Sequence, residues 1–266
     1  MDLMLEWLSF ALAGIVAGLT AGLFGIGGGL IIVPILVTVF SWQGMSAEIA
    51  IHVAIGTSLM TICVTSLSSM RAHHRYGTTQ WRLVAKLAPG LVLGSLIGAV
   101  IAANLSSQWL QSIFAVFALL MAVRMWMPPP SALSVRLLGK PLMSFYGLLT
   151  GVVSAMVGIG GGTLVVPYLV MAGQEIQKAV GTAAACGFPI AASGVIGFIW
   201  MGSQVHQVEG DWLTGFVHWQ AFLGVIATSV FMAPLGARLA RQLSHRKLSR
   251  LFSLVLLLVG LTLLSR

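Results

Sequence analysis

The sequence predicts an all-α polytopic membrane protein with two homologous halves, and three observations support this prediction. Hydrophobic residues make up 58% of the 266-residue chain, charged residues only 8%, and the mean hydropathy is +0.99, values that soluble domains of this length do not reach. Four uncharged runs are each longer than the roughly 20 residues that one helical span requires; they cover residues 7–47, 87–123, 141–174 and 179–208. A glycine-rich string in the first run returns in the third.

The repeated string contains four glycines in five residues and is followed by a proline. Gly25 to Gly29 and Pro34 recur as Gly158 to Gly162 and Pro167, each displaced by 133 positions. A glycine inside a helix costs about 1 kcal/mol relative to alanine, so we expect a helix break here. Lipid cannot satisfy the backbone groups that a break leaves open, so the break must face protein or a water-filled cavity. We therefore expect the glycines to line an interior site, with positive φ at Gly27 and Gly160.

The first half covers residues 1–127 and begins with an apolar stretch at 7–42 that the glycines interrupt. As one straight helix, the 41 residues of its uncharged run would be roughly 60 Å long, twice the ~30 Å hydrocarbon core of a bilayer. We therefore predict a hairpin that turns at the glycines. Three transmembrane helices follow, near residues 49–70, 83–103 and 109–127.

The second half, residues 141–266, repeats this pattern after a linker at 128–140 that begins with three prolines. Its broken stretch lies at 141–172, and its spans lie near residues 178–201, 213–237 and 248–265. None of the apolar runs alternates with polar residues as the strands of a transmembrane β-barrel do. The two halves are predicted to form one integral membrane domain.

Further matches extend the duplication beyond the glycine string. Ile55-Gly56-Thr57 corresponds to Val180-Gly181-Thr182, and Gly98-Ala99 corresponds to Gly236-Ala237. The halves are therefore homologous throughout.

The charges of equivalent loops indicate that the halves are inverted relative to each other. Loop 71–82 carries three arginines, whereas its counterpart at 202–212 carries two acidic residues; loop 104–108 is neutral, whereas its counterpart at 238–250 is basic. Loops rich in Lys and Arg stay in the cytoplasm, so equivalent loops lie on opposite sides. An inverted repeat needs an odd number of crossings in each half, which a hairpin plus three helices provides. The linker is then cytoplasmic and both termini are periplasmic.

The net charge of +8 comes from these loop clusters, so it is a topology signal and predicts no nucleic-acid partner. We expect no cleaved signal peptide, because Asp2 and Glu6 stand where a basic region would and the following apolar run is too long. Cys63 and Cys186 lie in apolar spans and are interpreted as packing residues. Few ionisable residues lie deep in any span, so we predict no metal site and no cofactor.

A helix that begins after a glycine-rich turn presents free N–H groups and the positive end of its dipole, which attract anions. Two such helix ends would meet near the membrane midplane if inverted hairpins enter from opposite faces. Hydroxyl groups on the following spans would add donors. The candidate substrate-binding residues are Gly25, Gly27, Gly28, Gly29, Thr57, Ser58, Gly158, Gly160, Gly161, Gly162 and Thr182. As an alternative, the glycines only allow close helix packing, and the hydroxyls bond to their own helix carbonyls.

Other interpretations of the polar residues are weaker. No Lys-Ser/Thr follows the glycines as in a phosphate loop, and the spacing is not that of a dinucleotide site. Glu48 and His52 lie near the predicted outer mouth, where they form either a proton relay or an ordinary interfacial pair.

The residues from Gly22 to Leu36, their repeat from Gly151 to Tyr168 and the paired Gly-Thr motifs resemble the sulfite exporter TauE/SafE family, also called toluene sulfonate uptake permeases. The resemblance covers nearly the whole chain. It implies a carrier of sulfur-containing anions, such as sulfite, thiosulfate or organosulfonates, in a bacterial inner membrane. The substrate class comes only from this resemblance. The resemblance does not identify the anion, the direction of transport or the oligomeric state.

The sequence favours a secondary transporter. It contains no ATP-binding motif, so an ion gradient or the substrate gradient must drive transport, and a proton is the coupling ion that we expect. Two other classes stay open: an intramembrane serine hydrolase that uses Ser193 with His206 or His218, and a membrane scaffold that transports nothing. The hydrolase lacks Gly-x-Ser-Gly at its nucleophile and gives the duplication no role.

Overall fold

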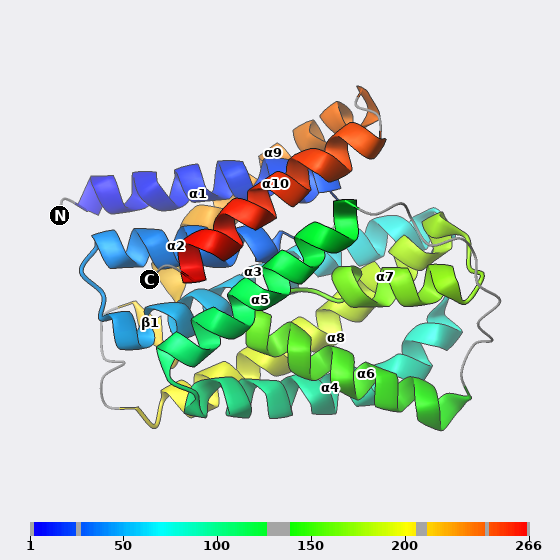
Figure 1. Ribbon diagram of the computed structural model, residues 1–266, viewed down its shortest axis with the longest axis horizontal. Helices are drawn as coiled ribbons and strands as arrows, with labels where there is room; N and C mark the ends of the chain where they lie inside the picture. The colour runs from blue at the N-terminus through cyan, green and yellow to red at the C-terminus, as the bar shows by residue number, and fades with distance from the viewer. Residues whose placement is uncertain (1–2, 25–27, 127–138, 206–211, 243–244, 265–266) are drawn as a thin grey trace.

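The computed structural model describes residues 3–24, 28–126, 139–205, 212–242 and 245–264. Within these residues the chain forms ten α-helices and one short β-hairpin (Figure 1). The prediction of an all-α fold is therefore confirmed for the described part of the chain, apart from that hairpin, whose strands have two residues each.

Five helices belong to each half of the chain. The first half contains α1 (Leu3–Phe24), α2 (Gly29–Trp42), α3 (Ala47–Arg75), α4 (Trp81–Asn104) and α5 (Ser107–Trp126). The second half contains α6 (Lys140–Val157), α7 (Gly162–Met171), α8 (Ile176–Gly202), β1 (Leu213–Thr214), β2 (Val217–His218), α9 (Trp219–Gln242) and α10 (His245–Leu264).

Four of these helices, α3, α4, α5 and α8, are long and apolar enough to cross a membrane by themselves. The other six contain shorter apolar segments. α2 has 14 residues and α7 has 10, so they are only about 21 Å and 15 Å long. Each follows a glycine string, and in Figure 1 α2 runs back along α1. The two apolar stretches are therefore broken at the glycines, as the sequence predicts.

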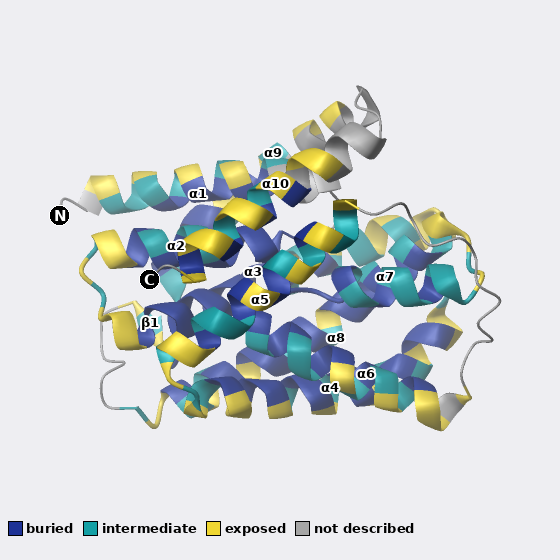
Figure 2. Ribbon diagram, viewed as in Figure 1, coloured by how far each residue is buried: buried dark blue, intermediate teal, exposed yellow. Residues whose placement is uncertain are grey.

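The centre of the bundle is formed by α3 and α8, which pack along each other. In the most apolar 18-residue segment of each helix, 78% of the residues are buried in α3 and 67% in α8, but only 33% in α5. Figure 2 shows the exposed residues on the outward faces of the surrounding helices. Large apolar side chains are exposed there, including Leu93, Val116 and Phe231. An outer surface of this kind suits contact with lipid.

Equivalent helices of the two halves make equivalent contacts: α1 packs along α9, and α6 packs along α4. A Cβ added to Gly18 would lie 2.6 Å from the carbonyl oxygen of Ser229, and one added to Gly151 would lie 2.5 Å from that of Leu91. These distances are below van der Waals contact, so both crossings require glycine. Gly18 and Gly151 are themselves 133 positions apart, like the two glycine strings.

The structure corrects the predicted boundaries of two spans. α9 begins at Trp219 and not near residue 213, because β1 and β2 form a tight hairpin whose turn includes Gly215 at a φ of +54°. α3 is longer than predicted at both ends. The Ser46 hydroxyl caps its start by accepting the N–H of Glu48 at 3.3 Å, and the helix continues through the basic residues to Arg75.

Candidate substrate site at the helix breaks

The first break lies between α1 and α2. Gly28 is the N-cap of α2 and has a φ of +73°, a conformation that favours glycine. Its carbonyl accepts the N–H groups of Ile31 at 3.0 Å and Ile32 at 2.9 Å, but no side chain caps the helix. Gly25 and Gly27 lie outside the described residues.

The second break lies between α6 and α7, where Gly161, the equivalent of Gly28, has a φ of −63°. Gly158 has a φ of +70° and ends α6; the N–H of Ile159 then donates to the carbonyl of Ser154 at 2.9 Å. The N-cap of α7 is Gly161, and no side chain caps that helix either. The prediction of positive φ at Gly160 is wrong, because the chain reverses direction two residues earlier.

The two breaks touch each other inside the bundle. A Cβ added to Gly29 would overlap the carbonyl oxygen of Gly158 and lie 3.0 Å from Cα of Ile159. The Ser58 hydroxyl on α3 donates to the same Gly158 carbonyl at 2.9 Å. The structure therefore brings Gly29, Ser58 and Gly158 together, three of the residues that the sequence singled out.

The remaining glycines of the second break pack on the two central helices. A Cβ added to Gly160 would lie 3.5 Å from Cγ2 of Ile62 on α3. One added to Gly161 would lie 3.2 Å from Cδ1 of Ile190 and 3.4 Å from Cβ of Cys186, both on α8. Gly162 is the first residue of α7. Cys186 is free and fully buried beside the break, as expected for a packing residue.

The hydroxyls of Thr57 and Thr182 bond to loops of the opposite half. The Thr57 hydroxyl accepts the N–H of His218, and the Thr182 hydroxyl accepts the N–H of Gln80, each at 3.0 Å. Gln80 precedes α4 and His218 precedes α9, so the two bonds are equivalent in the two halves. Sequence analysis found the Gly-Thr motifs but not these partners, which lie 102 and 161 positions away.

The glycine of each motif allows the same loop to approach. A Cβ added to Gly56 would overlap the carbonyl oxygen of Phe216, and one added to Gly181 would lie 2.8 Å from that of Thr78. Each Gly-Thr motif on one central helix therefore anchors the loop that follows the other central helix.

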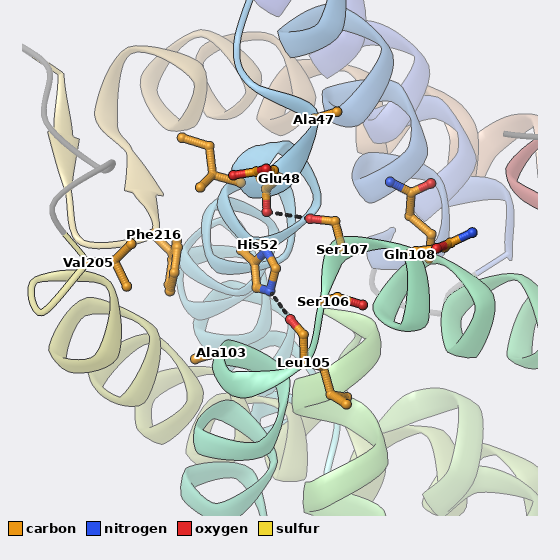
Figure 3. A pocket seen from close by; sticks show the side chains of 12 residues that line it. Ala47, Glu48, His52, Ala103, Leu105, Ser106, Ser107, Gln108, Val205 and Phe216 are labelled. Atoms are coloured by element: carbon orange, nitrogen blue, oxygen red, sulfur yellow. Dashed lines mark hydrogen bonds between the residues drawn. The ribbon is translucent and has the colours of Figure 1, made fainter.

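A cavity of about 580 Å³ lies at the start of α3 (Figure 3). His52 and Glu48 line it, together with the α4–α5 connection and Phe216. Nε2 of His52 lies 3.1 Å from the carbonyl oxygens of both Ala102 and Leu105, and its ring stacks on Phe216 with centroids 5.2 Å apart. A proton relay between Glu48 and His52 stays a prediction.

The residues of the hydrolase alternative do not form a catalytic pair in the described part of the chain. The Ser193 hydroxyl lies against that of Ser95 and donates to the carbonyl of Pro189 at 2.5 Å. His218 instead contacts the rings of Phe10 and Phe40, and its Nδ1 accepts the N–H of Ala221 at 3.2 Å. His206 is outside the described residues.

An apolar helical bundle in which two interrupted helices touch at their breaks is typical of a membrane transporter. The comparison with known families agrees. The chain belongs to the sulfite exporter TauE/SafE family, whose model matches residues 10–263. It is accordingly a multi-pass membrane protein of a transporter family and not an enzyme.

Relatives of this chain occur in bacteria and archaea. It is 35% identical to a "Probable membrane transporter protein" of Haemophilus influenzae, over 94% of this chain and 95% of the relative. It is 26% identical to the "Probable membrane transporter protein YunE" of Bacillus subtilis, over 93% of each chain. A probable membrane transporter protein of Methanocaldococcus jannaschii is 25% identical, over 95% of this chain and 93% of the relative. No solved structure matches the chain significantly.

Proposed function

We propose that this protein is a secondary transporter of small sulfur-containing anions, such as sulfite, thiosulfate or an organosulfonate, across the bacterial inner membrane. The observation that carries this proposal is the pair of helix starts at the breaks. α2 and α7 begin inside an apolar bundle, and neither has a side-chain cap. A buried helix start without such partners needs a ligand or water to satisfy its N–H groups, and an anion also complements the helix dipole.

The charge distribution suits an anion that must be released again. Every Lys and Arg of the described helices lies in the first six or last five residues of its helix, so none lies at the breaks. Each helix start supplies about half a unit of positive charge. Two of them attract a singly or doubly charged anion without the strong binding that a buried Arg or Lys would add.

We further propose that residues 1–127 and 141–266 form an inverted repeat joined by a cytoplasmic linker at 128–140. The equivalent contacts of α1 with α9 and of α6 with α4 support this arrangement. So do the helix directions in Figure 1, where α1 and α6 run in opposite senses and α1 begins at the end of the bundle where α10 ends. With the basic loops in the cytoplasm, both termini are periplasmic.

A proton gradient is the driving force that we propose. The exposed Glu48 and the buried His52 line the cavity at the predicted periplasmic end, and both carry groups that can exchange protons. The uptake assay that identifies the substrate can also determine the coupling ion and the direction of transport.

Uptake into proteoliposomes tests the function. Purified protein should accumulate isotope-labelled sulfite, thiosulfate or a small sulfonate, and an imposed pH gradient should change the rate. Empty liposomes and a Gly158→Val variant, checked for folding by its helical circular dichroism, serve as controls. Transport of cations or neutral solutes but none of these anions would refute the substrate class. A folded protein that moves nothing would favour the scaffold alternative.

A further inference from the structure

A line of hydroxyl groups distinguishes the second hairpin from the first. Tyr146, Thr150 and Ser154 are spaced four residues apart on α6 and so share one face of that helix. Thr150 and Ser154 are buried, with 2% and 0% of their surface exposed. The hydroxyl of Tyr146 donates to the carbonyl of Leu164 on α7 at 2.8 Å. This face of α6 is therefore turned toward α7.

Two residues of α7 continue the line. The ring of Tyr168 stacks on that of Tyr146 with centroids 4.3 Å apart. Thr163 is buried in the first turn of α7, with its hydroxyl 3.5 Å from the carbonyl oxygen of Gly160. The hydroxyls thus run along the hairpin toward its glycine break.

Ser154 lies at the inner end of this line, beside the break. Tyr146 and Tyr168 are level with each other, and both helices rise about 1.5 Å per residue. Ser154 follows Tyr146 by eight residues on α6, and Gly160 precedes Tyr168 by eight residues. Ser154 is therefore about level with Gly160 in the break. The carbonyl of Ser154 also accepts the N–H of Ile159 within the break itself.

The first hairpin has none of these hydroxyls. The five positions correspond to Ala13, Ala17, Ala21, Leu30 and Ile35 in the first half. α1 nevertheless packs along α9 as α6 packs along α4. The packing of α6 along α4 therefore does not require the hydroxyls, which face α7 instead.

The state of the Ser154 hydroxyl points to a ligand. It is buried and has no hydrogen-bond partner within the described part of the chain. A helical serine commonly donates to the carbonyl four residues earlier, as Ser193 does to Pro189. A buried hydroxyl without a partner is unfavourable. A ligand that accepts a hydrogen bond from Ser154 would offset that cost.

We propose that Ser154, with Thr150 and Thr163, binds the transported oxyanion on the second hairpin, so that the two halves contribute unequally to the site. This inference rests on the proposed function. Hydroxyls can donate to the oxygens of a sulfur oxyanion from several directions, and the start of α7 adds the positive end of a helix dipole.

The test compares wild-type protein with Ser154→Ala. Dissociation constants for sulfite and thiosulfate are measured by titration calorimetry on purified protein, and the melting temperature is measured without anion. We expect Ser154→Ala to raise the dissociation constant at least tenfold. Its melting temperature should not fall, because the substitution removes a hydroxyl that has no partner. Thr163→Val should weaken binding in the same direction.

Ser253→Ala is the matched control. Ser253 is also buried, but its hydroxyl donates to the carbonyl of Ala122 at 2.8 Å, far along the chain from the hairpins. This variant should lose stability and keep its anion affinity. If wild-type protein transports the anions and Ser154→Ala binds them equally well, the inference falls and the proposed function stands. A wild-type protein that binds none of the anions overturns both.

Discussion

Gly29 at the start of α2 lies against the carbonyl oxygen of Gly158 at the end of α6, and this contact joins the two helix breaks. The two residues belong to different halves of the chain. No side chain at position 29 can be added without moving one break away from the other.

The first prediction is that Gly29→Ala abolishes transport while the protein still folds and inserts. The added methyl group would overlap a backbone atom, and forcing extra volume into a packed interior costs about 1–3 kcal/mol. Proteoliposome uptake and the melting temperature measure the two effects. Gly139→Ala is the control, because Gly139 has a φ of −59° and an added Cβ would meet no atom closer than 3.9 Å. Normal uptake by Gly29→Ala would show that the breaks need not touch.

Valine substitutions at Thr57 and Thr182 test whether these threonines anchor loops or bind substrate. Replacing either with valine leaves a loop N–H without its acceptor, at a cost of about 1–3 kcal/mol. We expect each variant to lower the melting temperature by several degrees, because 1 kcal/mol corresponds to roughly 2–4 °C at this chain length.

Serine at the same positions keeps the hydroxyl and should restore the melting temperature. If the valine variants instead melt like wild-type protein and lose anion affinity several-fold, both threonines bind substrate directly.

The positions of the helix breaks could be predicted from the sequence because glycine clusters are incompatible with a continuous helix wherever they occur. The duplication predicted that the two breaks approach each other through the starts of α2 and α7, whereas Gly29 meets Gly158 at the end of α6. The partners of Thr57 and Thr182 could not be predicted, because a hydroxyl in a helix has no pattern that distinguishes a distant loop N–H from a carbonyl of its own helix.

Two further features could not be predicted from the sequence, for related reasons. Positive φ falls at Gly158 and not at Gly160, and composition alone cannot say which of several adjacent glycines turns the chain. The hydroxyl line ending at Ser154 was visible only as a difference between aligned halves, since each of its residues is ordinary in a membrane helix.

His218 predicts a dependence of stability on pH. Burial lowers its pKa to about 4, with nearby Glu6 acting in the opposite direction. The neutral ring accepts the N–H of Ala221 through Nδ1, which a proton would prevent. The unfolded chain, with a His pKa of about 6.5, binds the proton more readily than the folded one. Stability should therefore be fully present above pH 6.5 and decline as the pH falls toward 4.

His218→Asn should reduce this decline, because asparagine can also accept an N–H at a helix start but does not titrate. Melting temperatures of both proteins between pH 4 and 7.5 make the comparison. An equal decline in both would assign the acid sensitivity to other groups.

The last prediction concerns the orientation of the halves in the membrane. Tyr76 and Ser203 are the first residues after α3 and α8, both are exposed, and they occupy equivalent places in the two halves. Arginines flank Tyr76 at the end of α3 and the start of α4, whereas the acidic residues Glu209 and Asp211 follow Ser203. In a background with Cys63→Ala and Cys186→Ala, we expect Tyr76→Cys to react with a membrane-impermeant thiol reagent only from the cytoplasm and Ser203→Cys only from the periplasm. Gly139→Cys, before α6, should react from the cytoplasm. Labelling of Tyr76→Cys and Ser203→Cys from the same side would contradict the inverted repeat, because equivalent residues of a parallel repeat share one face of the membrane.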